Sequence, residues 1–141
     1  MRSKLIFTLM LAVALGSTSC NSTKNLGAIL QTLMGNDWEL SSLLGQAVSA
    51  DGFMNGLPSL NFEDGGKLLG STGCNRMNGS FNLSGKSISL DPGAVTKMAC
   101  PGDGEGKFLN ALGAVNSFKL AGDELTLLDG AKELLGFAPK K

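Results

Sequence analysis

Short stretches of alternating apolar and polar residues follow one another along most of the chain. In residues 58–63, for example, Leu60 and Phe62 alternate with polar neighbours, which is the pattern of a half-buried β-strand. Glycine-rich turns separate these stretches, as in hairpins. The predicted strands are 38–44, 58–63, 67–72, 79–84, 86–90, 94–99, 117–121, 124–128 and 132–137, with a possible return segment at 46–49 and a loop at 76–79.

Two other stretches show the spacing of a helix face. Apolar residues at positions 26, 29, 30, 33 and 34 predict a short amphipathic helix that ends at Gly35. Phe108 and Leu112 belong to the apolar face of a second predicted helix, 104–115, for which Asp103 is a suitable N-cap. We expect the first helix to pack on the domain, and the alternative is that it lies on a membrane surface.

These elements predict an α+β fold in a single small domain. Many short strands joined by tight turns favour a strongly curved, barrel-like antiparallel sheet of about eight strands. The main helix packs on this sheet and covers one open face or end, which avoids edge-to-edge pairing with other chains. The domain is expected at 36–138, preceded by a tether and the short helix at 21–35.

The first 20 residues have the pattern of an export signal. Arg2 and Lys4 precede an apolar run at 5–15, which is too short to span a bilayer. Small residues then lead directly to Cys20, as in a bacterial lipobox. We therefore expect Cys20 to be lipidated and to anchor the chain in a membrane. The alternative is an ordinary secretory signal with Cys20 near the cut.

A lipidated Cys20 sets the expected location. Asn21 follows it, where aspartate would direct retention in the inner membrane under the enterobacterial sorting rule. We therefore expect the outer membrane, with the domain facing the periplasm of the bacterial cell envelope.

Composition excludes several classes of function. Twelve basic and twelve acidic residues leave no positive excess for nucleic acid. The chain has no histidine, which removes the commonest general base and the commonest metal ligand. Nucleophile motifs of hydrolases are also absent from the sequence. We expect no enzymatic activity, no catalytic residues, no cofactor and no bound metal.

Cys74 and Cys100 lie 26 positions apart. In an oxidising periplasm they are expected to form a structural disulfide. Two alternatives stay open: buried free thiols that act as small apolar residues, or a redox or metal pair. The last lacks the CxxC spacing of redox motifs, and two cysteines fall short of a four-ligand zinc site.

Polar residues follow Cys74 directly. Asn75, Arg76 and Asn78 either form a recognition loop or, for the asparagines, serve the turn itself, because asparagine tolerates left-handed backbone geometry. Phe53 and Met54 present a similar choice: they form an exposed interaction tip or tuck under the sheet.

The motifs together resemble a known family. The resemblance is carried by Trp38-Glu39-Leu40, by Gly73-Cys74-Asn75, by Thr96-x-Met98-Ala99-Cys100, and by the closing Leu125-x-Leu127 and Leu135-x-Phe137. Over about residues 36–138 the chain is similar to the META domain, the HslJ-like family of bacterial envelope proteins. The resemblance implies a small mixed α/β domain, often on a lipoprotein, that is associated with heat induction and, in some members, with novobiocin tolerance. It implies no catalytic residue set.

Three hypotheses of function follow. The first is a non-catalytic interaction or structural module under envelope stress, which contacts another envelope protein or a cell-wall component. The second is a small-molecule binder that uses a cavity inside the sheet, lined by residues such as Leu60, Phe62, Phe81 and Leu127. The third is a thiol redox protein built on Cys74 and Cys100. A filled interior with an exposed patch favours the first hypothesis, and an internal cavity favours the second.

Overall fold

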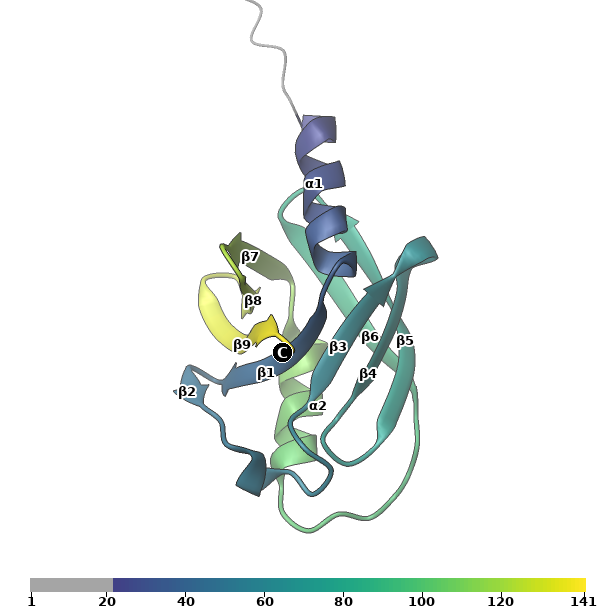
Figure 1. The fold of residues 1–141 in the computed structure, drawn as a ribbon, viewed down its shortest axis with the longest axis vertical. Helices are drawn as coiled ribbons and strands as arrows, with labels where there is room; N and C mark the ends of the chain where they lie inside the picture. Colours follow the sequence, from purple (N-terminus) through teal and green to yellow (C-terminus); the bar gives the residue numbers. More distant parts are fainter. Residues whose placement is uncertain (1–21) are drawn as a thin grey trace, which may run out of the picture.

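The computed structural model describes residues 22–141, so Cys20 and the predicted export signal lie outside the described residues. Figure 1 shows a small sheet curled around its own interior, with one helix projecting from one end and a second helix alongside the strands. The elements are α1 (Ser22–Met34), β1 (Asp37–Leu43), β2 (Gln46–Ala47), η1 (Ala50–Gly52), β3 (Ser59–Glu63), η2 (Asp64–Gly66), β4 (Lys67–Ser71), β5 (Arg76–Ser84), β6 (Ser87–Val95), α2 (Gly104–Ala114), β7 (Ser117–Ala121), β8 (Glu124–Asp129) and β9 (Lys132–Pro139).

The strands form a closed antiparallel barrel. Strands β1 and β3 to β9 pair in chain order, and β9 then pairs with β1, where Leu40 faces Phe137. The two-residue strand β2 pairs only with β1 and lies outside the ring. The predicted curved sheet of about eight strands with one main helix is therefore confirmed.

Two predicted boundaries are wrong, and both concern β5 and β6. Residues 76–79 are not a loop, because β5 begins at Arg76 and pairs with β4 from its first residue. Residues 94–99 are not a separate strand, because β6 continues to Val95. A bulge opposite Met77 and Asn78 absorbs the irregularity, and Gly93 supplies the positive φ of 60° that it needs.

The barrel interior is a single hydrophobic cluster. Trp38, Leu60, Phe62, Leu127 and Phe137 are all at most 1% exposed. The rings of Phe62 and Phe81 also meet edge to face, with centroids 5.0 Å apart. The alternating residues that predicted strands therefore supply the core from their inward face.

Helix α2 closes the barrel where its strands separate. Strands β6 and β7 share one residue pair, Ser87 with Ser117, and α2 lies between them in the sequence. Phe108 and Leu112 of α2 are completely buried against the core, as the helix spacing predicted. Asp103 precedes the helix but makes no side-chain capping bond.

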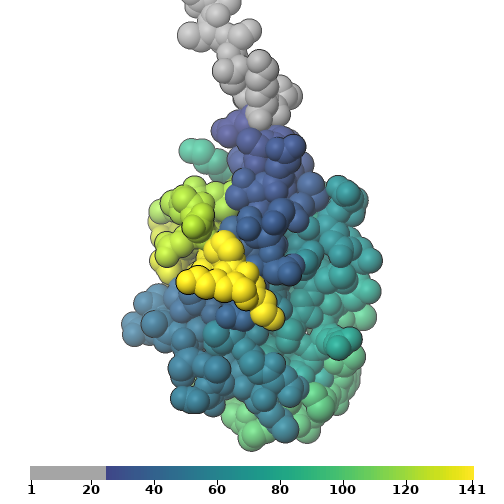
Figure 2. All heavy atoms as spheres, viewed as in Figure 1, coloured from purple at the N-terminus to yellow at the C-terminus, as the bar shows by residue number. Residues whose placement is uncertain are grey.

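Helix α1 packs against one end of the barrel with its C-terminal turns. Leu33 is fully buried, and its carbonyl accepts a hydrogen bond of 2.9 Å from Nε1 of Trp38. Figure 2 shows these turns between the C-terminal end of the chain and the teal strands of residues 59–84. Packing on the domain is thus confirmed, whereas the predicted tether differs, because the helix already begins at Ser22. In residues 22–141, neither α-helix combines the length and apolar character needed to cross a membrane.

Candidate binding site at the disulfide end of the barrel

The turn between β4 and β5 and the segment 96–103 meet at the end of the barrel opposite α1 (Figure 1). Cys74 lies in the turn between β4 and β5, and Cys100 lies in the segment 96–103 that leads into α2. They form a disulfide with their Cα atoms 6.0 Å apart, as predicted. Cys74 is buried and Cys100 is half-buried, so the bond reaches the surface on one side. We call this region the disulfide end.

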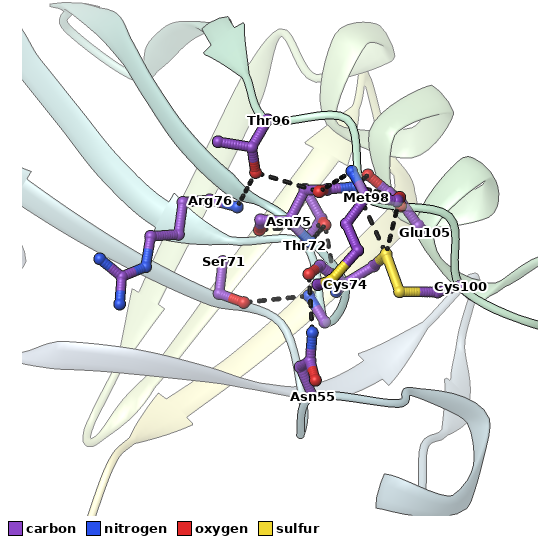
Figure 3. Close-up of a disulfide and its surroundings, with 11 residues drawn as sticks. Asn55, Ser71, Thr72, Cys74, Asn75, Arg76, Thr96, Met98, Cys100 and Glu105 are labelled. Carbon is purple, nitrogen blue, oxygen red and sulfur yellow. Dashed lines mark hydrogen bonds between the residues drawn. A yellow bond between two sulfur atoms is a disulfide. The ribbon is translucent and has the colours of Figure 1, made fainter.

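The side chain of Asn75 is the centre of a polar network (Figure 3). Its Oδ1 accepts hydrogen bonds from the backbone N–H of Met98, at 2.7 Å, and from Oγ1 of Thr96, at 3.0 Å. Its Nδ2 donates to the carbonyl of Met98 at 3.0 Å and to the carboxylate of Glu105 at 3.0 and 3.1 Å. Asn75 thus bonds Met98 through both backbone groups and links the segment 96–103 to the first turn of α2.

The turn itself is fixed by Thr72 and Gly73. Oγ1 of the fully buried Thr72 accepts hydrogen bonds from the backbone N–H groups of Cys74 and Asn75, at 3.3 and 2.8 Å. Gly73 has a φ of 83°, and a Cβ there would lie 2.4 Å from the Phe53 ring. The left-handed geometry that was predicted for an asparagine therefore belongs to Gly73. Asn55 completes the turn by donating to the Cys74 carbonyl at 2.8 Å.

The three residues of the predicted recognition loop, Asn75, Arg76 and Asn78, have different environments in the structure. Asn75 is only 5% exposed, and its side chain holds the fold together. Arg76 and Asn78 lie on strand β5 instead of a loop, and both point to the exposed face. A recognition role for these two residues stays a prediction. Thr96, Met98 and Glu105 were not predicted as partners of Asn75; the alternate spacing of Thr96, Met98 and Cys100 was the available signal.

Phe53 and Met54 have opposite environments. Phe53 is half-buried against the core cluster, next to Gly73 and Gly104. Met54 is 64% exposed beside it. Each of the two predicted alternatives is therefore correct for one residue.

Two hollows flank the segment 96–103. The larger, of about 510 Å³, lies beside the disulfide, and we call it the disulfide-end hollow. Its lining includes Phe53, Met54, Cys74, Cys100, Pro101, Asp103, Lys107, Leu109 and Asn110. The smaller, of about 370 Å³, is lined partly by Met98, which is 52% exposed. Glu105 and Leu109 border both hollows.

One ion pair lies at the rim of the larger hollow. Nζ of Lys107 is 2.8 Å from a carboxylate oxygen of Asp103, and both side chains are largely exposed. The hydrogen bond and positive charge of Lys107 hold the pKa of Asp103 below its usual value. In the part of the chain that the structure describes, no three cysteine or acidic side chains gather closely enough to hold a metal ion.

An eight-stranded closed antiparallel barrel with a covering helix and a disulfide beside that helix defines a class of small α+β barrel domains. The META domain family matches residues 31–141, and the chain belongs to that family. The predicted resemblance is therefore confirmed.

Solved structures share this fold. A crystal structure of a DUF4847 family protein from Bacteroides vulgatus is 15% identical, with a TM-score of 0.64 over 80% of this chain and 98% of that one. An NMR structure of a protein from Burkholderia xenovorans is 24% identical, with a TM-score of 0.61 over 96% and 99% of the two chains. A further NMR structure is 25% identical, with a TM-score of 0.62 over 78% and 93%.

These matches describe a domain family without an assigned reaction. Neither the META nor the DUF4847 family is known as an enzyme family. None of the curated proteins matches the chain significantly.

Proposed function

We propose that this chain is a lipid-anchored protein of the bacterial cell envelope whose META domain is a non-catalytic binding module. Cys20 carries the lipid, and the outer membrane, on its periplasmic side, is the expected location. The partner is a peptide segment of another envelope protein, and the role is linked to envelope stress. The binding surface is the disulfide-end hollow.

The observation that carries this proposal is the contrast between a filled interior and a hollowed end. Leu60, Phe62, Phe81 and Leu127, which would line an internal ligand cavity, belong to one packed cluster. The disulfide-end hollow, in contrast, lies on the surface and is held by a covalent bond. Its volume falls in the range of about 300–1,000 Å³ that is typical of binding pockets, as do the volumes of other surface hollows, so the disulfide in its wall is what distinguishes it.

The chemistry of the lining suits a peptide. Phe53, Met54 and Leu109 supply apolar contacts, while Lys107 and Asn110 supply hydrogen bonds at the rim. An exposed methionine is flexible and polarizable, so it adapts to apolar side chains of varied shape. The wall formed by the disulfide-bonded segment 96–103 and the adaptable Met54 together favour a preformed site with modest selectivity.

The redox alternative has less support. Cys74 is only 5% exposed, so the bond is reached from the half-buried Cys100 alone. The bond also joins the β4–β5 turn, which Thr72 stabilises by hydrogen bonds, to the segment 96–103. A catalytic disulfide needs a sulfur that a thiolate can reach and a leaving thiolate that is stabilised. A structural bond is the simpler role for this pair.

The binding site can be tested by photo-cross-linking in the native host. A photoreactive residue at the exposed Asn110 should give a discrete adduct with another envelope protein, and Met54→Asp should abolish it. Lys119→Asp, an exposed change on β7, is the matched control and should leave the adduct intact. No adduct, or an adduct that Met54→Asp does not change, would contradict the proposal.

The anchor can be tested by intact mass. The protein from its native host, alkylated before and after reduction, should carry acyl chains on Cys20. Cys74 and Cys100 should react only after reduction. A mass without lipid would overturn the anchor, and free alkylation of the unreduced protein would overturn the disulfide.

A further inference from the structure

The position of α1 relative to the predicted anchor carries a further inference. The helix begins at Ser22, so only Asn21 separates it from Cys20. One or two extended residues reach at most about 7 Å. The lipid would therefore be joined almost directly to a helix, where the sequence had suggested a flexible tether.

That helix is held firmly by the barrel. Leu33 is fully buried, and its carbonyl bonds the indole of the buried Trp38. A groove of about 370 Å³ lies between the helix and strand β5, and Leu26 and Leu30 line it together with Phe81. Packing on the core cluster thus runs from the last turn of α1 back to Ile29, and the earlier turns project beyond the barrel (Figure 1).

The two ends of the barrel lie at opposite ends of strand β5. Ser84 ends the strand beside the β5–β6 turn, next to the residues that face α1. Arg76 begins it at the disulfide end, where its carbonyl accepts a hydrogen bond from the N–H of Thr96. Nine extended residues span roughly 30 Å. Figure 1 shows α1 projecting from the end that is opposite the segment 96–103.

We propose that α1 is a rigid spacer that turns the β5–β6 end of the barrel toward the bilayer surface and points the disulfide end away from it. This inference rests on the proposed lipid anchor. The partner of the β5–β6 end is the lipid surface, and the disulfide-end hollow faces the aqueous compartment. The thirteen residues of α1 measure about 20 Å, and because its C-terminal turns lie against the barrel, only the projecting part of the helix separates the β5–β6 end from the anchor.

Energy transfer from two labelled sites tests the orientation. Lys86→Cys places a dye in the β5–β6 turn, and Lys97→Cys places the same dye at the disulfide end. Both lysines are exposed, so the two variants lose the same charge and carry the dye at equally accessible positions. In full-length lipidated protein on phosphatidylethanolamine and phosphatidylglycerol vesicles with acceptor headgroups, transfer from position 86 should be several-fold higher than from position 97.

A flexible insertion tests the rigid spacer. Six Gly and Ser residues between Asn21 and Ser22 add a coil of about 14 Å and should bring the ratio of the two transfers toward one. The same six residues added after Lys141 are the control and should leave the ratio unchanged. A circular dichroism spectrum like that of the unchanged protein verifies that each variant is folded.

The outcomes separate the inference from its premise. Protein without an acyl mass, which does not stay on the vesicles, overturns the anchor and the inference with it. Lipidated protein that stays on the vesicles but shows equal transfer, or higher transfer from position 97, overturns the orientation alone. A ratio that the insertion does not change overturns the rigid spacer.

Discussion

The two ends of the barrel are held by different kinds of contact. At the α1 end, most of the contacts are between buried apolar side chains. Leu33 is fully buried, and one hydrogen bond from the Trp38 indole to the Leu33 carbonyl fixes the helix. At the disulfide end, a covalent bond and the hydrogen bonds of Asn75 hold a segment that has no regular secondary structure. Burial stabilises the first end, and directional bonds stabilise the second.

The difference explains how a surface loop can form a rigid wall. Residues 96–99 are exposed, so little apolar burial is available to order them. Asn75 instead bonds both backbone groups of Met98, and Cys100 is fixed by its bond to Cys74. This surface can therefore stay exposed without losing its shape.

The largest expected effect is at the apolar end. Leu33→Ala should lower the free energy of unfolding by about 4 kcal/mol, because a fully buried leucine leaves a cavity and loses its transfer energy. Chemical denaturation measures the loss. Leu44→Ala, at a half-exposed leucine in the β1–β2 turn, is the control and should change little. An equally small loss for Leu33→Ala would show that burial does not hold the α1 end.

Removal of the disulfide sharpens the comparison. Cys74→Ser with Cys100→Ser should cost roughly 3 kcal/mol, since the bond closes a loop with a separation of 26 residues. Hydrogen exchange should rise first at the N–H of Met98 and stay slow in the last turn of α1. Faster exchange at both ends together would mean that the two ends unfold as one unit.

Asn75→Ala tests the polar network without touching the bond. It should destabilise the domain by about 2 kcal/mol, because buried groups that Asn75 satisfies lose their partners. Asn78→Ala, on the exposed face of β5, is the matched control. Thermal unfolding compares the two variants. A similar small change for both would refute the central role of Asn75.

The smallest effect is expected at the exposed ion pair. Lys107 lowers the pKa of Asp103, so this pair contributes stability above the pKa that Asp103 has in the unfolded chain, near 3.8. The contribution is lost as the pH falls through the lower folded pKa. Below about pH 4 the thermal unfolding midpoint of the unchanged protein should fall slightly as Asp103 becomes protonated. Asp103→Asn should remove this part of the pH dependence. An unchanged pH profile would show that solvent screens the pair completely.

The sequence predicted the fold better than the site. Alternation marked most strands because each strand turns one face to the core, as Leu60 and Phe62 do. The continuity of β6 through Gly93 was missed, because a bulge interrupts the alternation without ending the strand. Strands β1 and β9 pair although they lie at opposite ends of the domain sequence. The local alternation of apolar and polar residues does not predict a pairing over such a distance along the chain.

The site depended on contacts that only the folded chain makes. The disulfide between Cys74 and Cys100 could be predicted, because the predicted domain contains just these two cysteines and an oxidising compartment was expected. Asn75 has a polar side chain after a turn, which in sequence resembles any surface asparagine. Its burial arises because Met98 and Glu105 come from later in the chain to surround it.

Pairing between β1 and β9 also has a consequence for biosynthesis. The ring joins Trp38 to Pro139, so the first strand to emerge during synthesis finds its second neighbour only when the last strand is complete. Until then, β1 presents an unpaired edge, which is a template for aggregation. A C-terminal truncation before β9 would leave this sheet open, so we expect it to lower the yield of folded protein from the cell.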